Sequence, residues 1–143
     1  MIRLIILTLP LMILSACDPN EWLESHRSEF YIKNSTNNTL TISTNPQKTS
    51  REMIVSPNDS IMIYGSGRCL GDKMFPPFED IHVFEDIYVY DTEGNVFREW
   101  HLEDMTTEEH SIFKEEVWKH YKEHIEGPKY AFIWVYDICN EKP

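Results

Sequence analysis

Short runs rich in β-branched and aromatic residues recur along the chain and limit the folds that it can adopt. Several of these runs alternate apolar with polar residues, and segments containing Gly, Pro, Asn, Asp or Ser separate them. A two-residue period is typical of strands with one buried face. Many short strands separated by turns predict a mainly β fold, an antiparallel β-sandwich. The predicted strands are residues 30–33, 39–43, 52–55, 60–64, 86–90, 96–100 and 130–136.

The segments between these runs contain the residues that turns require. Residues 91–95, Asp-Thr-Glu-Gly-Asn, tolerate positive φ and predict a hairpin between the strands on either side. Residues 34–38 and 56–59 predict two further hairpins. The run 130–136 is apolar throughout, so we expect it to form a strand that is buried on both faces at the centre of a sheet.

One helix is expected in the C-terminal half of the chain. Thr106 or Thr107 is a suitable N-cap, acidic residues follow in the first turn, and Gly127-Pro128 would end the helix after about residue 125. The predicted fold class is therefore mainly β, an antiparallel β-sandwich with one α-helix. The alternative is an α+β fold in which the helix packs on one face of an antiparallel sheet.

Glu116, His120 and His124 follow one another at four-residue spacing and would share one face of that helix. Two imidazoles at this spacing can bind a metal ion. The residues around them do not form the His-Glu-x-x-His motif of zinc proteases, and no spacing identifies the third ligand that a catalytic zinc needs. We therefore interpret His120 and His124 as packing residues at the edge of the apolar face, and we predict no metal and no cofactor.

The N-terminal residues have the composition of an export signal. Arg3 supplies a positive charge, residues 4–14 are mostly apolar, and Ser15 and Ala16 are small. An apolar stretch of about 11 residues is shorter than the roughly 20 that a transmembrane helix needs. This order of segments is typical of a secretory signal peptide. We predict that residues 1–16 are removed and take no part in the fold.

Leu14-Ser15-Ala16-Cys17 resembles the bacterial lipobox. The resemblance implies that the Cys17 thiol receives a diacylglycerol and that the new N-terminus is acylated after the signal is removed. Each buried CH₂ group of an acyl chain contributes about 0.8 kcal/mol, so two or three chains would hold the protein on a membrane. The whole chain is similar to small lipoproteins of Bacteroidota-type Gram-negative bacteria. This similarity implies a lipid anchor on the inner or outer membrane, with the domain in the periplasm or on the cell surface.

Polar residues without periodicity follow the cysteine. We expect residues 17–29 to be the lipidated cysteine and a tether, and residues 30–143 to be a single globular β-rich domain. The chain has a formal net charge of −11, and removal of Arg3 with the signal gives the mature protein a charge of −12. A surface this acidic repels phosphate backbones, which argues against nucleic acid as a partner.

Cys69 and Cys139 are the cysteines that remain once Cys17 is acylated. An exported protein folds in an oxidising environment, where a bridge that closes a loop of about 70 residues would add roughly 4 kcal/mol of stability. We therefore predict a disulfide between Cys69 and Cys139. The alternative is two separate buried thiols.

Residues 65–80 form the longest irregular stretch of the chain. Met74, Phe75 and Phe78 lie in its Pro-rich part and have no obvious position in the core. Exposed aromatic residues are typical of contact sites for proteins or sugar rings, so we predict that these three residues contact a partner. The alternative is that Phe75 and Phe78 fold back and cap one end of the sandwich.

The sequence contains no arrangement of residues that supports catalysis, so we do not predict an enzyme. Ser66 is not in the Gly-x-Ser-x-Gly setting of a hydrolase, and residues 91–95 lack the distal glutamate of a calcium-binding loop. We expect a membrane-anchored module that binds or assists an envelope protein or glycan. One alternative is a periplasmic immunity or inhibitor lipoprotein that neutralises a basic toxin or enzyme. The other is a metal-dependent enzyme that uses His120 and His124.

Overall fold

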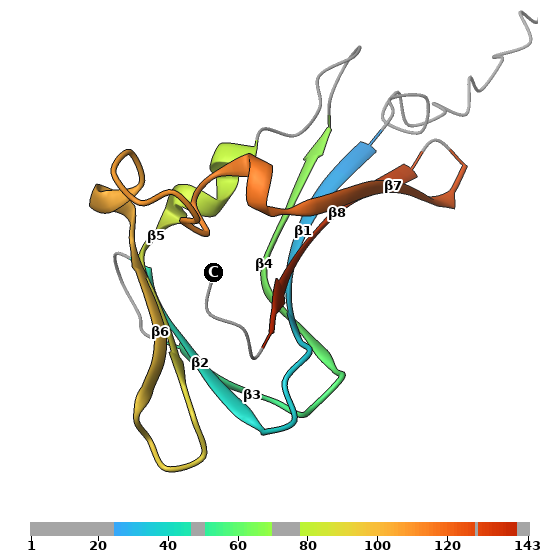
Figure 1. The fold of residues 1–143 in the computed structure, drawn as a ribbon. Helices are drawn as coiled ribbons and strands as arrows, with labels where there is room; N and C mark the ends of the chain where they lie inside the picture. The colour runs from blue at the N-terminus through green and yellow to red at the C-terminus, as the bar shows by residue number, and fades with distance from the viewer. Residues whose placement is uncertain (1–24, 47–50, 70–77, 128, 140–143) are drawn as a thin grey trace, which may run out of the picture.

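The computed structural model describes residues 25–46, 51–69, 78–127 and 129–139. Within these residues the chain forms two four-stranded sheets that face each other across an apolar core (Figure 1). The prediction of a mainly β fold is confirmed. Sheet A has the strand order β4-β1-β8-β7 and consists of β1 (Ser25–Asn34), β4 (Ser60–Cys69), β7 (Lys119–Glu126) and β8 (Lys129–Ile138). Sheet B has the order β3-β2-β5-β6 and consists of β2 (Leu40–Pro46), β3 (Arg51–Val55), β5 (Phe84–Tyr90) and β6 (Val96–His101).

Successive strands often change sheet. The chain passes from sheet A to sheet B between β1 and β2, and returns to sheet A between β3 and β4. The hairpins predicted at residues 34–38 and 56–59 are therefore wrong, although both segments turn the chain. Each turn places the apolar side chains of the next strand against the opposite side of the same core. The predicted hairpin of β5 and β6 is confirmed, because these strands pair in antiparallel fashion across residues 91–95.

A parallel pair lies at the centre of sheet A. β1 and β8 run side by side, with Ser25 opposite Lys129 at one end and Asn34 opposite Ile138 at the other. β8 also pairs with β7 on its other side. Side chains on both faces of β8 are buried, among them Trp134 toward the core. The prediction that residues 130–136 form a central strand is confirmed.

The globular domain begins earlier than the sequence pattern predicts. β1 starts at Ser25, which already pairs with β4 and β8. Residues 25–29 are polar and have no strand-like hydrophobic pattern, but hydrogen bonding to two neighbouring strands holds them in the sheet. The predicted tether, residues 17–29, therefore overlaps the first strand by five residues.

The core lies between the inner faces of the two sheets. Phe30 and Ile32 of β1 are fully buried two residues apart, and Ile42 of β2 faces them from sheet B. The Phe30 ring lies nearly parallel to Trp134 at 5.9 Å and meets Trp118 edge-on at 5.5 Å. Such ring pairs add about 0.5–1.5 kcal/mol to the stabilisation from burial alone, so aromatic packing contributes substantially to this fold.

The helix predicted to end after residue 125 is not formed. Tight turns, the short 3-10 helix η4 (Glu115–Val117) and strand β7 occupy its place. Thr107, a predicted cap, donates its hydroxyl to the carbonyl of Asp104 and closes a turn. Gly127, the predicted end of the helix, has a φ of 53° at the β7–β8 hairpin. Because pairing with β7 satisfies backbone groups on one side of β8, this tertiary contact overrides the weak helix propensity of the segment.

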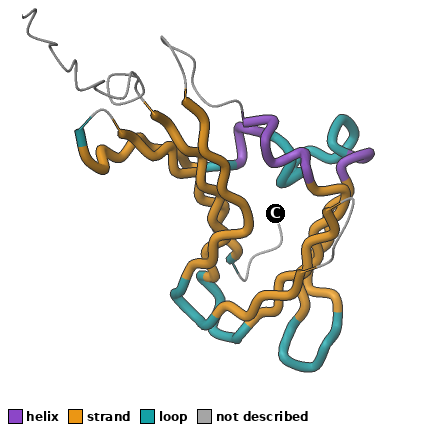
Figure 2. Tube along the Cα trace, turned by 180° about the vertical axis from the view of Figure 1, so that it is seen from behind, coloured by secondary structure: helices purple, strands orange, loops and turns teal. Residues whose placement is uncertain are grey.

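Irregular segments close one end of the core. They are η2 (Phe78–Val83) and residues 102–118, which include η3 (Leu102–Asp104) and η4, and we call them the cap. Figure 2 shows the helical parts of the cap (purple) bridging the two sheets. Ile112 and Trp118 of the cap are buried, and the Trp118 indole N–H donates to the Ile112 carbonyl at 2.6 Å. The cap is therefore packed into the core on its inner side.

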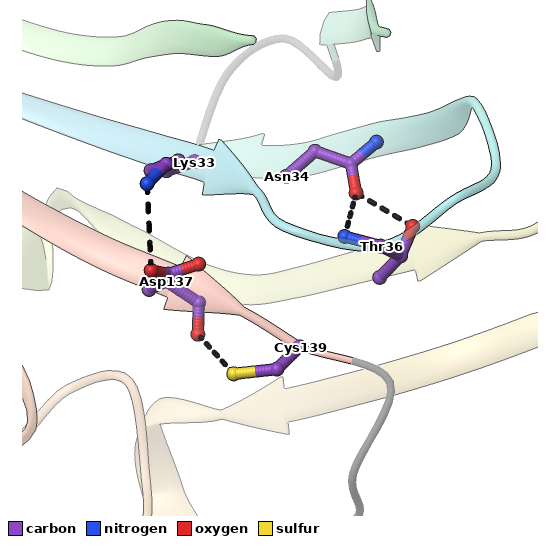
Figure 3. Close-up of polar contacts among 5 residues, drawn as sticks. All are labelled: Lys33, Asn34, Thr36, Asp137 and Cys139. Carbon is purple, nitrogen blue, oxygen red and sulfur yellow. Dashed lines mark hydrogen bonds and ion pairs between the residues drawn. The ribbon is translucent and has the colours of Figure 1, made fainter. Parts of the chain in front are cut away.

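Asn34 at the end of β1 connects several turns through its buried side chain. Its amide nitrogen donates to the carbonyls of Asn38 and Val55, at 2.8 and 3.1 Å. Its side-chain oxygen accepts hydrogen bonds from the backbone N–H and the hydroxyl of Thr36, at 3.0 and 2.7 Å (Figure 3). The β1–β2 turn is therefore fixed against β3 by buried polar contacts.

Candidate functional site

Two tyrosines lie side by side on the outer face of sheet B. Ile87 and Val89 of β5 face the core, so the alternate residues Tyr88 and Tyr90 lie on the opposite face. Both tyrosines are partly exposed. Their ring centroids are 6.2 Å apart and the ring planes differ by 22°. Such a pair supplies a rigid apolar surface with a polar hydroxyl on each ring.

Polar residues from three adjacent strands surround these rings. Asp86 of β5 binds Nδ1 of His101 on β6 at 2.7 Å and accepts a hydrogen bond from the Asn45 amide on β2 at 3.3 Å. The His101 ring also meets the Tyr88 ring edge-on at 5.7 Å. Asn45, Asp86, Tyr88, Tyr90 and His101 therefore form one connected surface, which we call the tyrosine face.

The charges on this surface alter its titration. The hydrogen bond that Asp86 accepts from His101 raises the pKa of His101 above its ordinary value. Partial burial opposes this effect, and the Asp86 charge adds to it. The pKa of Tyr88 is also raised, first by desolvation and then by the charges of Asp86 and Glu99. His101 therefore carries a proton to higher pH than a free histidine does, and the Tyr88 hydroxyl stays neutral.

The tyrosine face combines aromatic rings with hydrogen-bond donors and acceptors. Asp86 already holds Asn45 and His101, so these side chains are positioned before any ligand arrives. Positioned side chains lose less conformational entropy on binding. The arrangement is suited to binding a polar ligand by ring contact and directed hydrogen bonds.

The cap carries a strong excess of acidic residues. Against the single lysine, Lys114, its described residues include Glu79, Asp80, Glu103, Asp104, Glu108, Glu109, Glu115 and Glu116. Like charges at this density repel one another, and a cationic partner would relieve the repulsion. Charge complementarity therefore favours the cap as a contact for a basic protein.

The contact site predicted around residues 74–78 is described only at its end. Met74 and Phe75 lie outside the described residues, as does Cys17. Phe78 is buried, and its ring meets Phe30 at 5.8 Å and Trp134 at 5.2 Å. Phe78 therefore caps the core, which was the alternative to an exposed contact.

The strand order places Cys69 and Cys139 too far apart for the predicted disulfide. Cys69 pairs with Ser25 at the start of β1, whereas Cys139 follows Ile138, which pairs with Asn34 at the end of β1. Nine residues of extended strand, at about 3.3 Å each, place the two ends about 30 Å apart. A disulfide requires α-carbons within about 7 Å. Cys139 is an exposed free thiol.

The two histidines that a helix would bring together lie on one strand, which holds them apart. His120 and His124 both lie on β7, where four residues span about 13 Å, too far for both imidazoles to bind one metal ion. Each ring contacts an aromatic residue of β8 instead: His120 meets Trp134 at 4.7 Å, and His124 meets Tyr130 at 5.2 Å. No group of three His, Cys, Asp or Glu residues in the described part of the chain is arranged to hold a metal.

Sequence reasoning did not identify the tyrosine face. Asp86, Tyr88 and Tyr90 show the two-residue period that places them on one face of β5, and this signal is visible in the sequence. His101 lies opposite Asp86 in the β5–β6 hairpin, whereas Asn45 lies on β2 and only the sheet order brings it to Asp86.

None of the helical turns in the described residues has the length and hydropathy of a membrane-spanning segment. Neither a protein-family model, nor a curated protein, nor a solved structure matches the chain.

Proposed function

We propose that the protein is a lipid-anchored envelope lipoprotein that binds a glycan through the tyrosine face. The observation that carries the binding proposal is the placement of Tyr88 and Tyr90 beside the Asp86–His101 pair on one sheet face. Cys17 in the lipobox-like segment supplies the anchor, and the β-rich domain presents the face to ligands in the envelope.

A sugar is the ligand class that this set of side chains favours. Pyranose rings have apolar faces that pack on aromatic side chains and hydroxyl groups that exchange hydrogen bonds with carboxylate, amide and imidazole groups. A single-stranded nucleic acid also stacks on aromatic residues but requires a basic groove for its phosphates. The net charge of −11 opposes such a ligand.

Replacement of both tyrosines tests the binding proposal. In Tyr88→Ala/Tyr90→Ala we expect affinity for the recognised glycan to fall at least tenfold, because both ring contacts are lost. Binding should be measured with a glycan array, followed by calorimetry on the strongest oligosaccharide. Tyr121→Ala on β7 removes an exposed tyrosine from the other sheet and should leave the affinity unchanged. If the wild type binds no saccharide, or if the double variant binds as well as the wild type, the proposal is wrong.

The lipid anchor is tested separately by Cys17→Ser. We expect this variant to lose a lipid-sized mass and to be released from the membrane fraction, because the thioether-linked lipid is then absent. Intact mass spectrometry and membrane fractionation measure the two effects. An unlipidated wild-type protein would contradict the anchor and leave the glycan proposal to be judged on its own result.

The acidic cap favours a second candidate function, an inhibitor or immunity lipoprotein for a basic protein. Eight acidic residues against Lys114 give the cap the charge that such a partner would recognise. Glu108→Lys/Glu109→Lys should weaken the complex and reduce its dependence on salt. A gene for a basic toxin beside this one would supply the partner for that measurement.

A further inference from the structure

The outer face of sheet A contains a partly exposed apolar patch. Met62 of β4, Tyr31 of β1 and Val135 of β8 occupy one row, which Lys119 of β7 ends. In the next row Tyr121 of β7 lies beside the buried Ile133, and Ile133 lies beside Glu29 of β1. Met62 is 43% exposed and Tyr121 is 54% exposed. Exposed apolar surface of this kind marks a contact with a protein or a membrane.

The strands of sheet A also differ from the cap in charge. The described side chains on the strands of sheet A nearly balance: Arg27, Lys33, Lys119, Lys122 and Lys129 against Glu29, Glu123, Glu126 and Asp137. Two of these acidic groups are paired, Glu29 with Arg27 and Asp137 with Lys33. The cap, by contrast, has eight acidic residues and one lysine. An anionic surface would therefore repel the cap and tolerate sheet A.

The position of the anchor selects between possible occupants of this face. β1, which belongs to sheet A, begins at Ser25, eight residues after Cys17. A fully extended chain spans at most about 3.6 Å per residue, so the start of β1 lies within about 29 Å of the lipidated cysteine. Ser25 lies opposite Lys129, at the end of the sheet where the β7–β8 hairpin turns (Figure 1). The anchor therefore keeps this end of sheet A within about 29 Å of the lipidated cysteine.

We propose that the outer face of sheet A rests on the surface of the lipid bilayer. This inference depends on the proposed lipid anchor at Cys17. Tyr31 and Tyr121 suit the interface between headgroups and acyl chains, where an apolar ring and a polar hydroxyl are both accommodated. Sheet B and its tyrosine face then point away from the membrane, because they lie on the opposite side of the core (Figure 1).

The orientation is measured with a fluorescent label on single introduced cysteines. In a Cys69→Ser/Cys139→Ser background, Tyr121→Cys and Met62→Cys place the label on sheet A, and Ile54→Cys, at a site that is 70% exposed, places it on sheet B. The lipidated protein is reconstituted in phosphatidylethanolamine and phosphatidylglycerol vesicles that carry a quencher in the acyl chains. We expect labels at positions 121 and 62 to shift to the blue and to be quenched at least threefold more than the label at position 54.

Flotation and intact mass are measured first on the same samples, so that the two proposals fail separately. Protein without lipid contradicts the anchor. Lipidated protein that floats with the vesicles, but whose labels at positions 121 and 62 stay in water, overturns only the proposed orientation. If those labels are shielded without vesicles and in proportion to protein concentration, a second copy of the chain covers the face and the bilayer proposal is wrong. Using two positions on separate strands protects the test against misfolding of one variant.

Discussion

The contributions of Asn34 and His101 to the structure depend on the groups that hydrogen-bond to them. Asn34 is fully buried and all of its side-chain hydrogen-bonding groups point to neighbours in adjacent turns. His101 is half-exposed and depends on one carboxylate, that of Asp86. Both residues look ordinary in the sequence, because their importance comes from which groups the fold places beside them.

Asn34→Ala should destabilise the protein by at least about 2 kcal/mol. The substitution removes the acceptor of the Thr36 backbone N–H and a donor to the Val55 carbonyl in a buried site, and each unsatisfied group costs about 1–3 kcal/mol. Urea denaturation gives the free energy of unfolding. Asn37→Ala, at an exposed position in the same turn, should change it by less than about 0.5 kcal/mol. Equal effects of the two substitutions would contradict the buried network.

Asp86→Asn should lower the pKa of His101 toward that of a free histidine. In the folded wild type this pKa is raised, so the ion pair stabilises the protein most at pH values below the ordinary histidine pKa, and this stabilisation is lost as pH rises through the raised value. NMR titration of the His101 ring measures the pKa, and thermal melts across that range measure the stability. A His101 pKa that is the same in both proteins would show that the contact does not persist in solution.

The sequence of a turn in this chain does not indicate whether a helix or a strand precedes it. Gly94 has a φ of 83° and Asp91 accepts hydrogen bonds from the backbone of Glu93 and Asn95, so the β5–β6 hairpin follows from local chemistry. Gly127 also adopts a positive φ, at the β7–β8 hairpin, although the residues before it have the composition of a helix. Turn residues predicted where the chain bends, but not whether a helix or a strand precedes the bend.

Gly94→Ala should cost about 1–2 kcal/mol, the price of a left-handed conformation for a residue with a β-carbon. The added methyl group meets no atom within 4 Å, so the loss comes from the backbone alone. Gly67→Ala in β4 is the matched control, because its methyl group also meets nothing within 4 Å and its φ lies outside the positive range. Thermal denaturation should show a clear loss only for Gly94→Ala. A comparable loss in both variants would show that the positive φ of Gly94 is not the cause.

At the scale of the whole molecule, the parallel pairing of β1 with β8 organises sheet A. It joins residues near the two ends of the described chain and sets the distance between Cys69 and Cys139. It also places the start of β1 beside the β7–β8 hairpin, which orients the apolar outer face relative to the anchor. Pairings this distant in sequence leave no periodic signal, so the predicted disulfide failed for a topological reason.

Reductant should leave the melting temperature of the folded protein unchanged, because no bridge joins Cys69 to Cys139. Loss of a native disulfide typically costs 2–5 kcal/mol, which a thermal melt would detect readily. A maleimide reagent should also label Cys139 in the folded protein without prior reduction, since the thiol is exposed. A large fall in melting temperature on reduction, together with an unreactive Cys139, would contradict the strand order of sheet A.

The mainly β class, the β5–β6 hairpin and the buried central strand at residues 130–136 could all be predicted from the sequence, because strand period and turn chemistry are local properties. Tertiary pairing makes residues 119–126 a strand, separates His120 from His124, and brings Asn45 of β2 to Asp86 of β5. These outcomes depend on which backbone groups find partners across the sheets. Segments distant in the chain decide that pairing, whatever the local propensity.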